Sequence, residues 1–179
     1  MENVIFYKSS RGYRDMQKQF NDKTEELRLL QVERNSTQES LGRGGFNDPE
    51  LVLMIQTENN LKDQIEKIQK LLGASQIIEV TDETRNTSNV RIGSIVKLDI
   101  FNISSLIGYA EVWEIAGYNE TLIEDKKLAY NSPIAKQILG ASRGELLEEV
   151  LIEPNILDIQ ISEMFSSWSE VPKKFQIHK

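Results

Sequence analysis

The sequence contains no cysteine and a single histidine, His178, in a chain of 179 residues. The absence of cysteine excludes a disulfide framework, a thiolate metal site and a cysteine nucleophile. A lone histidine leaves no His-Asp pair to activate a serine and no histidine cluster to bind zinc. No Gly-Lys-Ser or Gly-Lys-Thr phosphate-binding motif is present either. We therefore predict that the protein is not an enzyme in its own right and has no stable metal site.

Long apolar runs are also missing, and basic residues are outnumbered. No stretch of about 18 apolar residues occurs, and the first residues do not form a signal peptide, so we expect no membrane contact. The net charge is −7, which disfavours broad binding to nucleic acid because such binding depends on lysine and arginine releasing counterions. We therefore expect a cytoplasmic protein whose partner is another protein with a basic or metal-bearing cleft.

Residues 9–73 carry a heptad pattern in two segments. Between the segments lies 42–50, where three glycines and then Pro49 are typical of the end of one helix and the start of the next. The pattern predicts an antiparallel helical hairpin, and arms of about 25–33 residues would make a rod about 40–50 Å long. The seam positions are Tyr13, Met16, Phe20, Lys23, Leu27, Leu30, Arg34, Thr37 and Leu41, followed by Leu51, Met54, Glu58, Leu61, Ile65, Ile68 and Leu72.

Three of these seam positions are charged: Lys23, Arg34 and Glu58. Arg34 and Glu58 fall at about the same height on opposite arms if the turn lies near residues 45–46. A charge in a seam is costly without a partner, so we predict an ion pair that sets the register of the hairpin.

After Gly73 the apolar period changes from about 3.5 to about 2, which indicates strands. A short helix is predicted from Pro133, with Ser132 as its N-cap and Gly140 after its end. The predicted fold class is α+β: a helical hairpin followed by a small antiparallel sheet with one short helix. The predicted strands cover 76–80, 90–101, 106–117, 145–152 and 156–164, and a further region over 127–130 leads to the short helix.

This organisation predicts a hairpin domain over 1–75, a sheet domain over 76–165 and a tail over 166–179. The tail lacks a clear period, so we expect it to dock loosely or to fray. Periodicity alone leaves the role of the hairpin open, since a bundle arm or a dimerising coiled coil has the same pattern.

Several motifs occur in a characteristic order over about residues 9–164. Arg11-Gly12 opens the hairpin, Gln76-Ile77-Ile78-Glu79 leaves it, and Val90-Arg91-Ile92-Gly93 starts the sheet. Ser132-Pro133-Ile134-Ala135 and then Gly144-Glu145-Leu146 follow. In this order and spacing they resemble the bacterial Gre transcript-cleavage and elongation factors. The resemblance implies a coiled-coil N-terminal domain and an FKBP-like C-terminal domain.

The resemblance also implies a function. In the Gre family the sheet domain docks at the rim of the RNA polymerase secondary channel, and the hairpin enters the channel. Acidic residues at its tip help to hold the second magnesium ion, so that the polymerase itself cleaves backtracked RNA. For this chain the resemblance implies RNA polymerase as partner, the transcript contacted only indirectly, a monomer, and no cofactor beyond magnesium shared with the polymerase.

Two groups of residues are candidates for these contacts. Asn131, Ser132 and Pro133 match the family's docking loop, although Ser132-Pro133 is equally a helix start. At the tip, the family's Asp and Glu fall at 43–44 and 46–47, which here hold Arg43, Gly44, Phe46 and Asn47.

Asp48 and Glu50 are the nearest carboxylates to the tip positions. They are either displaced metal-directed groups or a plain helix start, in which Asp caps and Glu lies in the first turn. Arg43 and Phe46 could instead insert into the channel without donating ligands. Stimulation of cleavage, inhibition by occupying the channel, and a coiled-coil interaction protein that does not bind polymerase therefore all remain open.

Overall fold

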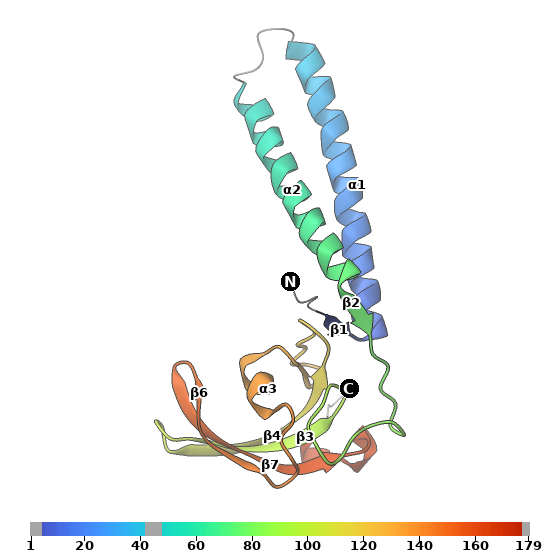
Figure 1. The fold of residues 1–179 in the computed structure, drawn as a ribbon. Helices are drawn as coiled ribbons and strands as arrows, with labels where there is room; N and C mark the ends of the chain where they lie inside the picture. The colour runs from blue at the N-terminus through green and yellow to red at the C-terminus, as the bar shows by residue number, and fades with distance from the viewer. Residues whose placement is uncertain (1–4, 42–47, 177–179) are drawn as a thin grey trace. The chain divides into compact units, whose positions relative to one another are not determined.

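The structure is a computed structural model that describes residues 5–41 and 48–176. The chain divides into two compact units, one built around two long helices and the other around a β-sheet (Figure 1). The hairpin unit contains helix α1 (Ser10–Leu41) and helix α2 (Pro49–Gly73). Strand β1 (Phe6–Lys8) pairs with strand β2 (Ser75–Ile77) in a sheet of two strands. Within the described residues, no helix is both long enough and apolar enough to cross a membrane.

The predicted heptad seam is confirmed in the hairpin unit. Along both helices, the described side chains at the predicted positions are withdrawn from solvent, and most of the residues between them are exposed, with Gln31 and Leu71 among the exceptions. Met16, Leu51 and Leu61 are buried at 7%, 2% and 4% exposure. Burial of one stripe on each helix is what stabilises an antiparallel hairpin whose outer faces are charged.

The sheet unit has five strands in the order β5-β4-β3-β7-β6. The strands are β3 (Ile95–Asn102), β4 (Ile107–Ala116), β5 (Lys127–Ala129), β6 (Leu146–Ile152) and β7 (Asn155–Phe165). The prediction of a purely antiparallel sheet is wrong, because β5 runs parallel to β4. Residues 117–126 carry the chain back along the sheet before β5 begins. The strand β5 therefore runs in the same direction as β4 and does not form an antiparallel hairpin with it.

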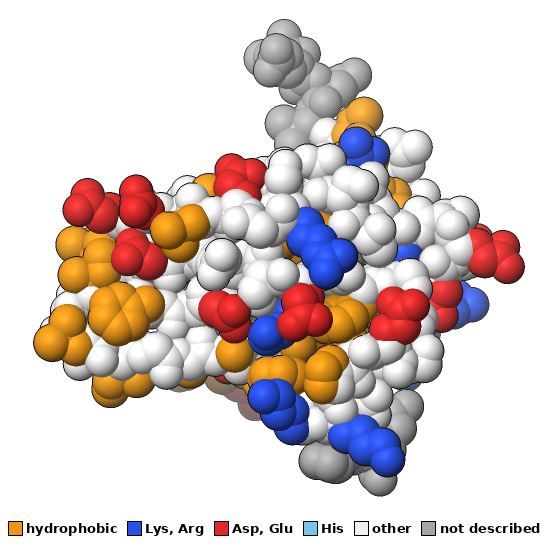
Figure 2. Space-filling model, turned by 90° about the horizontal axis from the view of Figure 1, so that it is seen from below, with side chains coloured by type: hydrophobic (Ala, Val, Ile, Leu, Met, Phe, Trp, Pro, Cys, Tyr) orange, Lys and Arg blue, Asp and Glu red, His pale blue; other side chains and the backbone are white. Residues whose placement is uncertain are grey.

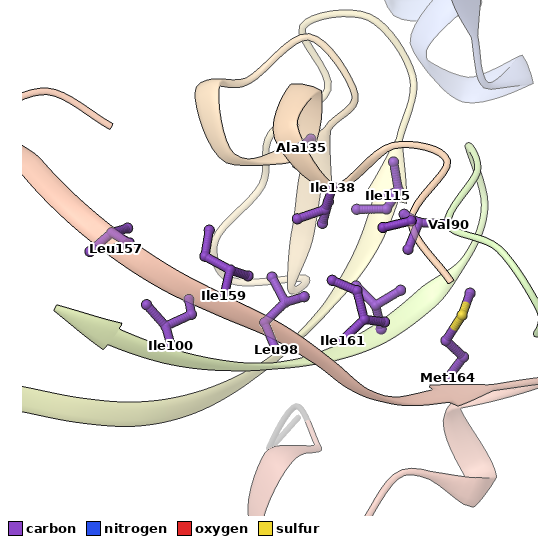
Figure 3. Close-up of a cluster of buried hydrophobic side chains, with 12 residues drawn as sticks. Val90, Leu98, Ile100, Ile115, Ala135, Ile138, Leu157, Ile159, Ile161 and Met164 are labelled. Carbon is purple, nitrogen blue, oxygen red and sulfur yellow. The ribbon is translucent and has the colours of Figure 1, made fainter. Parts of the chain in front are cut away.

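Helix α3 (Pro133–Ile138) closes the core over one face of this sheet. Because side chains alternate along a strand, Leu98 and Ile100 point to the same face. Figure 3 shows them beneath Ala135 and Ile138 of α3, all at 2% exposure or less. The strand predicted to begin at Val90 begins instead at Ile95, because residues 91–94 form a turn in which the amide of Ser94 donates to the carbonyl of Arg91.

The tail packs on the opposite face of the sheet, so the expectation of loose docking is wrong for residues 166–176. Ile95, Val112 and Phe165 point away from the main core and bury Val171 to 2% exposure. Trp168 also packs there, and its indole nitrogen donates to Glu114 Oε2 over 3.1 Å. The tail contains two short helices, η2 (Trp168–Glu170) and η3 (Lys173–Phe175). Apolar side chains in and between these helices make the contact with the sheet, which the sequence period did not reveal.

Candidate functional site

The hairpin tip is described from Asp48 onward. Asp48 is the N-cap of α2: its Oδ1 accepts hydrogen bonds from the amides of Glu50 (2.9 Å) and Leu51 (3.3 Å). Pro49 opens the helix, and Glu50 lies exposed in the first turn. These are the features of the helix-start interpretation. The other two tip candidates, Arg43 and Phe46, lie outside the described residues.

The predicted ion pair within the hairpin is confirmed. Arg34 Nη1 lies 3.4 Å from Glu58 Oε2, and Glu58 is only 4% exposed. Two further donors reach the same carboxylate: Lys62 Nζ at 2.6 Å and Gln31 Nε2 at 3.1 Å. These hydrogen bonds, first that of Lys62 and then that of Gln31, hold the pKa of Glu58 below its ordinary value.

Sequence reasoning missed Gln31 and Lys62, although a local signal existed for both. Lys62 follows Glu58 by four residues and Gln31 precedes Arg34 by three, so each shares a helix face with its neighbour. The four side chains together form a polar layer in a mainly apolar seam.

The docking candidates lie together in the sheet unit at the start of α3. Ser132 is the N-cap, its hydroxyl accepting from the amide of Ala135 over 3.3 Å, and Pro133 is exposed. Asn131 exchanges two hydrogen bonds with Asn119: Oδ1 accepts from the Asn119 amide (2.9 Å), and Nδ2 donates to Asn119 Oδ1 (2.7 Å). Sequence reasoning did not identify Asn119, which has a φ of 57°, a conformation that asparagine adopts more readily than most residues.

The segment Tyr7–Ser9 belongs to the sheet unit and braces the loop that carries Asn119. Lys8 is 7% exposed, and its ammonium group donates to the carbonyl of Tyr118 over 2.9 Å. The amide of Ser9 donates to Glu120 Oε1 over 3.0 Å. Gly117 is required here, because a Cβ on it would lie 2.8 Å from the Cα of Lys8. The loop beside the docking candidates is therefore held from both sides.

Among the described side chains, no group of three or more His, Cys, Asp or Glu residues could hold a metal ion. Asp48 and Glu50 at the tip, and Asn131, Ser132 and Pro133 at the start of α3, stay predicted contact positions.

The fold and these positions define a class: an α+β protein in which a coiled-coil hairpin with a polar layer precedes a mixed five-stranded sheet. No family model matches the chain. Its sequence is 30% identical over 88 residues to the transcription elongation factor GreA of Alkaliphilus oremlandii, covering 49% of this chain and 52% of that protein. GreA of Metamycoplasma arthritidis is 31% identical over 101 residues, covering 56% of this chain and 59% of that protein.

The chain spans about half the length of the curated relatives it matches. These sequence matches confirm the predicted resemblance to the Gre transcription elongation factors. Similar solved structures include Gfh1 of Thermus aquaticus, with 19% identity, a TM-score of 0.41, and coverage of 90% of this chain and 99% of that one. GreA/GreB from Nitrosomonas europaea has 16% identity, a TM-score of 0.31, and coverage of 64% and 88%.

Proposed function

We propose that this protein is a cytoplasmic transcription elongation factor that binds RNA polymerase through the secondary channel. The hairpin domain, residues 1–75, enters the channel, and the sheet domain, residues 76–165, docks at its rim through Asn131, Ser132 and Pro133. The observation that carries the proposal is the sequence similarity to GreA factors. The protein acts as a monomer, contacts the transcript only indirectly, and has no catalytic activity of its own.

Two modes of action remain within this proposal, and one observation favours the second. In the first, tip carboxylates hold magnesium at the polymerase active site and stimulate RNA cleavage. In the second, the hairpin occupies the channel without donating metal ligands. Asp48 is engaged through Oδ1 in capping α2, which favours the second mode.

Cleavage of backtracked RNA separates these modes. We expect that, with magnesium and RNA polymerase of the same organism, the protein competes with a GreA factor but does not itself stimulate cleavage. Asp48→Asn should compete as well as the parent, because asparagine also caps, whereas Asp48→Ala should destabilise α2 by about 1 kcal/mol. Glu50→Ala should compete unchanged, since Glu50 is exposed and does not cap.

Each other outcome has a defined meaning. Cleavage by the parent that disappears in Asp48→Asn or Glu50→Ala would show that the carboxylates act on metal, and would contradict channel occupation. Neither cleavage nor competition, together with a dimer in light scattering, would favour the coiled-coil interaction protein that does not bind polymerase.

The docking segment gives a second prediction. Ser132→Asp retains a side-chain acceptor at the N-cap but places a charge on the proposed contact surface. We expect it to leave the thermal midpoint nearly unchanged and to weaken competition for polymerase about tenfold, the effect of losing roughly 1.4 kcal/mol of contact energy. Lys173→Ala, on the tail, is the matched surface control and should compete normally. Equal effects of both variants would contradict docking at this segment.

A further inference from the structure

The face of the sheet opposite α3 is covered over only part of its length. At one end the tail lies on it, with Trp168 and Val171 against Ile95 and Val112. Figure 2 views the sheet unit from this side and shows hydrophobic side chains, with carboxylates beside them, gathered at the left of the view. The chain's own apolar segment thus covers one end of this face, and the described residues leave the other end open.

The open end of this face carries apolar, acidic and amide side chains from strands β3, β6 and β7. Pairing between strands places Phe101 opposite Gly108 and Asp158, and Gln160 opposite Asp99 and Leu146, all on one face. We call Asp99, Phe101, Leu146, Asp158 and Gln160 the outer patch. These residues line an open depression of ≈ 480 Å³, which Gly108, having no side chain, helps to keep open. Phe101 and Leu146 are 40% and 50% exposed.

The charge around the outer patch is negative. Among the charged side chains that the described strand pairing places around this patch, one is a cation, Lys97. Its ammonium group already forms ion pairs with Glu163 (2.9 Å) and Asp99 (3.8 Å). The hydrogen bond to Glu163 raises the pKa of Lys97, so the ammonium stays charged and paired. Asp158 adds a third carboxylate, whose Oδ1 accepts from the amide of Glu149 over 2.9 Å. An exposed phenyl ring beside carboxylates suits a ligand that is both apolar and cationic.

We propose that the outer patch binds a cationic apolar peptide segment of a second protein, with aliphatic or aromatic side chains over Phe101 and Leu146 and a lysine or arginine beside Asp99 and Asp158. The carboxylates disfavour nucleic acid and anionic lipid. A second copy of this chain is disfavoured because each copy carries a net charge of −7. The surface lies on the opposite face of the sheet from α3, so this interaction is independent of the polymerase docking proposed above.

The test is a titration of the full-length, isotopically labelled protein with three synthetic peptides, followed by nuclear magnetic resonance. The probes alternate arginine with leucine, glutamate with leucine, and arginine with serine. We expect the arginine-leucine peptide to shift amides around the outer patch. The other two should bind at least tenfold more weakly, because each lacks one half of the required chemistry. Raising the salt concentration should weaken the binding.

Variants locate the site. Phe101→Thr keeps a strand-forming residue but removes the ring, and should weaken binding about tenfold. Asp99→Asn should weaken it less and reduce its salt dependence. Leu122→Ser removes a 45% exposed leucine elsewhere in the sheet unit and should bind like the parent. Thermal melts confirm that each variant is folded, so loss of binding is not loss of fold.

Four results would overturn the proposal. These are equal binding of the acidic peptide, shifts that map away from the outer patch, and an equal effect of Leu122→Ser. The fourth is self-association in sedimentation that Phe101→Thr abolishes, which would identify a second copy as the occupant.

Discussion

Replacing Gly93 by alanine is expected to destabilise the sheet unit by about 3 kcal/mol, from two separate costs. Gly93 has a φ of 89°, and an added Cβ would lie 2.5 Å from Cγ2 of Val80. The left-handed backbone costs an alanine roughly 1–2 kcal/mol, and overpacking against the branched side chain of Val80 costs about 1–3 kcal/mol. Equilibrium unfolding in denaturant, followed by tryptophan fluorescence, measures the sum.

Two further variants separate these costs. Gly144 has a φ of 85° but open space around the added Cβ, so Gly144→Ala should lose only the backbone contribution of about 1 kcal/mol. Val80→Ala in the Gly93→Ala background should recover part of the loss, with Val80→Ala alone as the baseline of the cycle. Equal losses for Gly93→Ala and Gly144→Ala would show that contact with Val80 contributes nothing.

Replacing Glu58 by alanine is expected to destabilise the hairpin by about 2–3 kcal/mol. The change removes the shared acceptor of Lys62, Gln31 and Arg34 and leaves the guanidinium of Arg34, with 28% side-chain exposure, in the seam without its carboxylate. Removing one partner of a fully buried ion pair costs roughly 3–5 kcal/mol, and the partial exposure of Arg34 reduces that figure. Helical circular dichroism in denaturant provides the measurement, with Glu66→Ala in an exposed pair with Lys70 as the control.

The double variant Arg34→Leu/Glu58→Leu tests what the polar layer is for. Replacing a buried ion pair by apolar residues is often neutral or stabilising, so we expect a hairpin at least as stable as the parent. We also expect lower specificity, seen as dimers in sedimentation, because a seam that lacks this ion pair can align in more than one register. A strictly monomeric double variant would contradict the proposed register role.

Acid should weaken the parent hairpin through the same residue. The pKa of Glu58 is lowered in the folded protein, chiefly by the hydrogen bond from Lys62. Its stabilising contribution is therefore fully present above the ordinary glutamate pKa of about 4.3, and is lost as the pH falls from there through the lowered value. The double variant lacks this carboxylate and should show a shallower decline of stability over that range.

Local pattern was sufficient for the hairpin and for α3. The heptad spacing identified the buried stripe on both helices, and it paired Arg34 with Glu58 because helix rise and turn position convert sequence distance into height. The helix start at Ser132-Pro133 was also predictable, because capping depends on neighbouring residues only. The motifs shared with Gre factors could likewise be read in order along the chain.

In the sheet unit, contacts between different segments of the chain were not predictable, and they hold the unit together. Arg85 lies in a segment that reads as a polar connector, yet its side chain is 6% exposed, donates to the carbonyl of Ser166 and lies 3.6 Å from Glu114. Asn119 with Asn131, and Gly93 against Val80, are further pairs in which each residue looks ordinary in its own stretch of sequence.

The sequence by itself thus determined the seam, the ion pair within it, the alternation of the main strands and the family resemblance, because each depends on residue types and spacing along the chain. Only the tertiary structure decided that β5 is parallel, that the tail covers one end of the sheet and that the outer patch is left open. Those outcomes depend on which surfaces come into contact when the chain folds. Because the burial of apolar surface is non-directional, the local period of a segment does not specify which other segment it packs against.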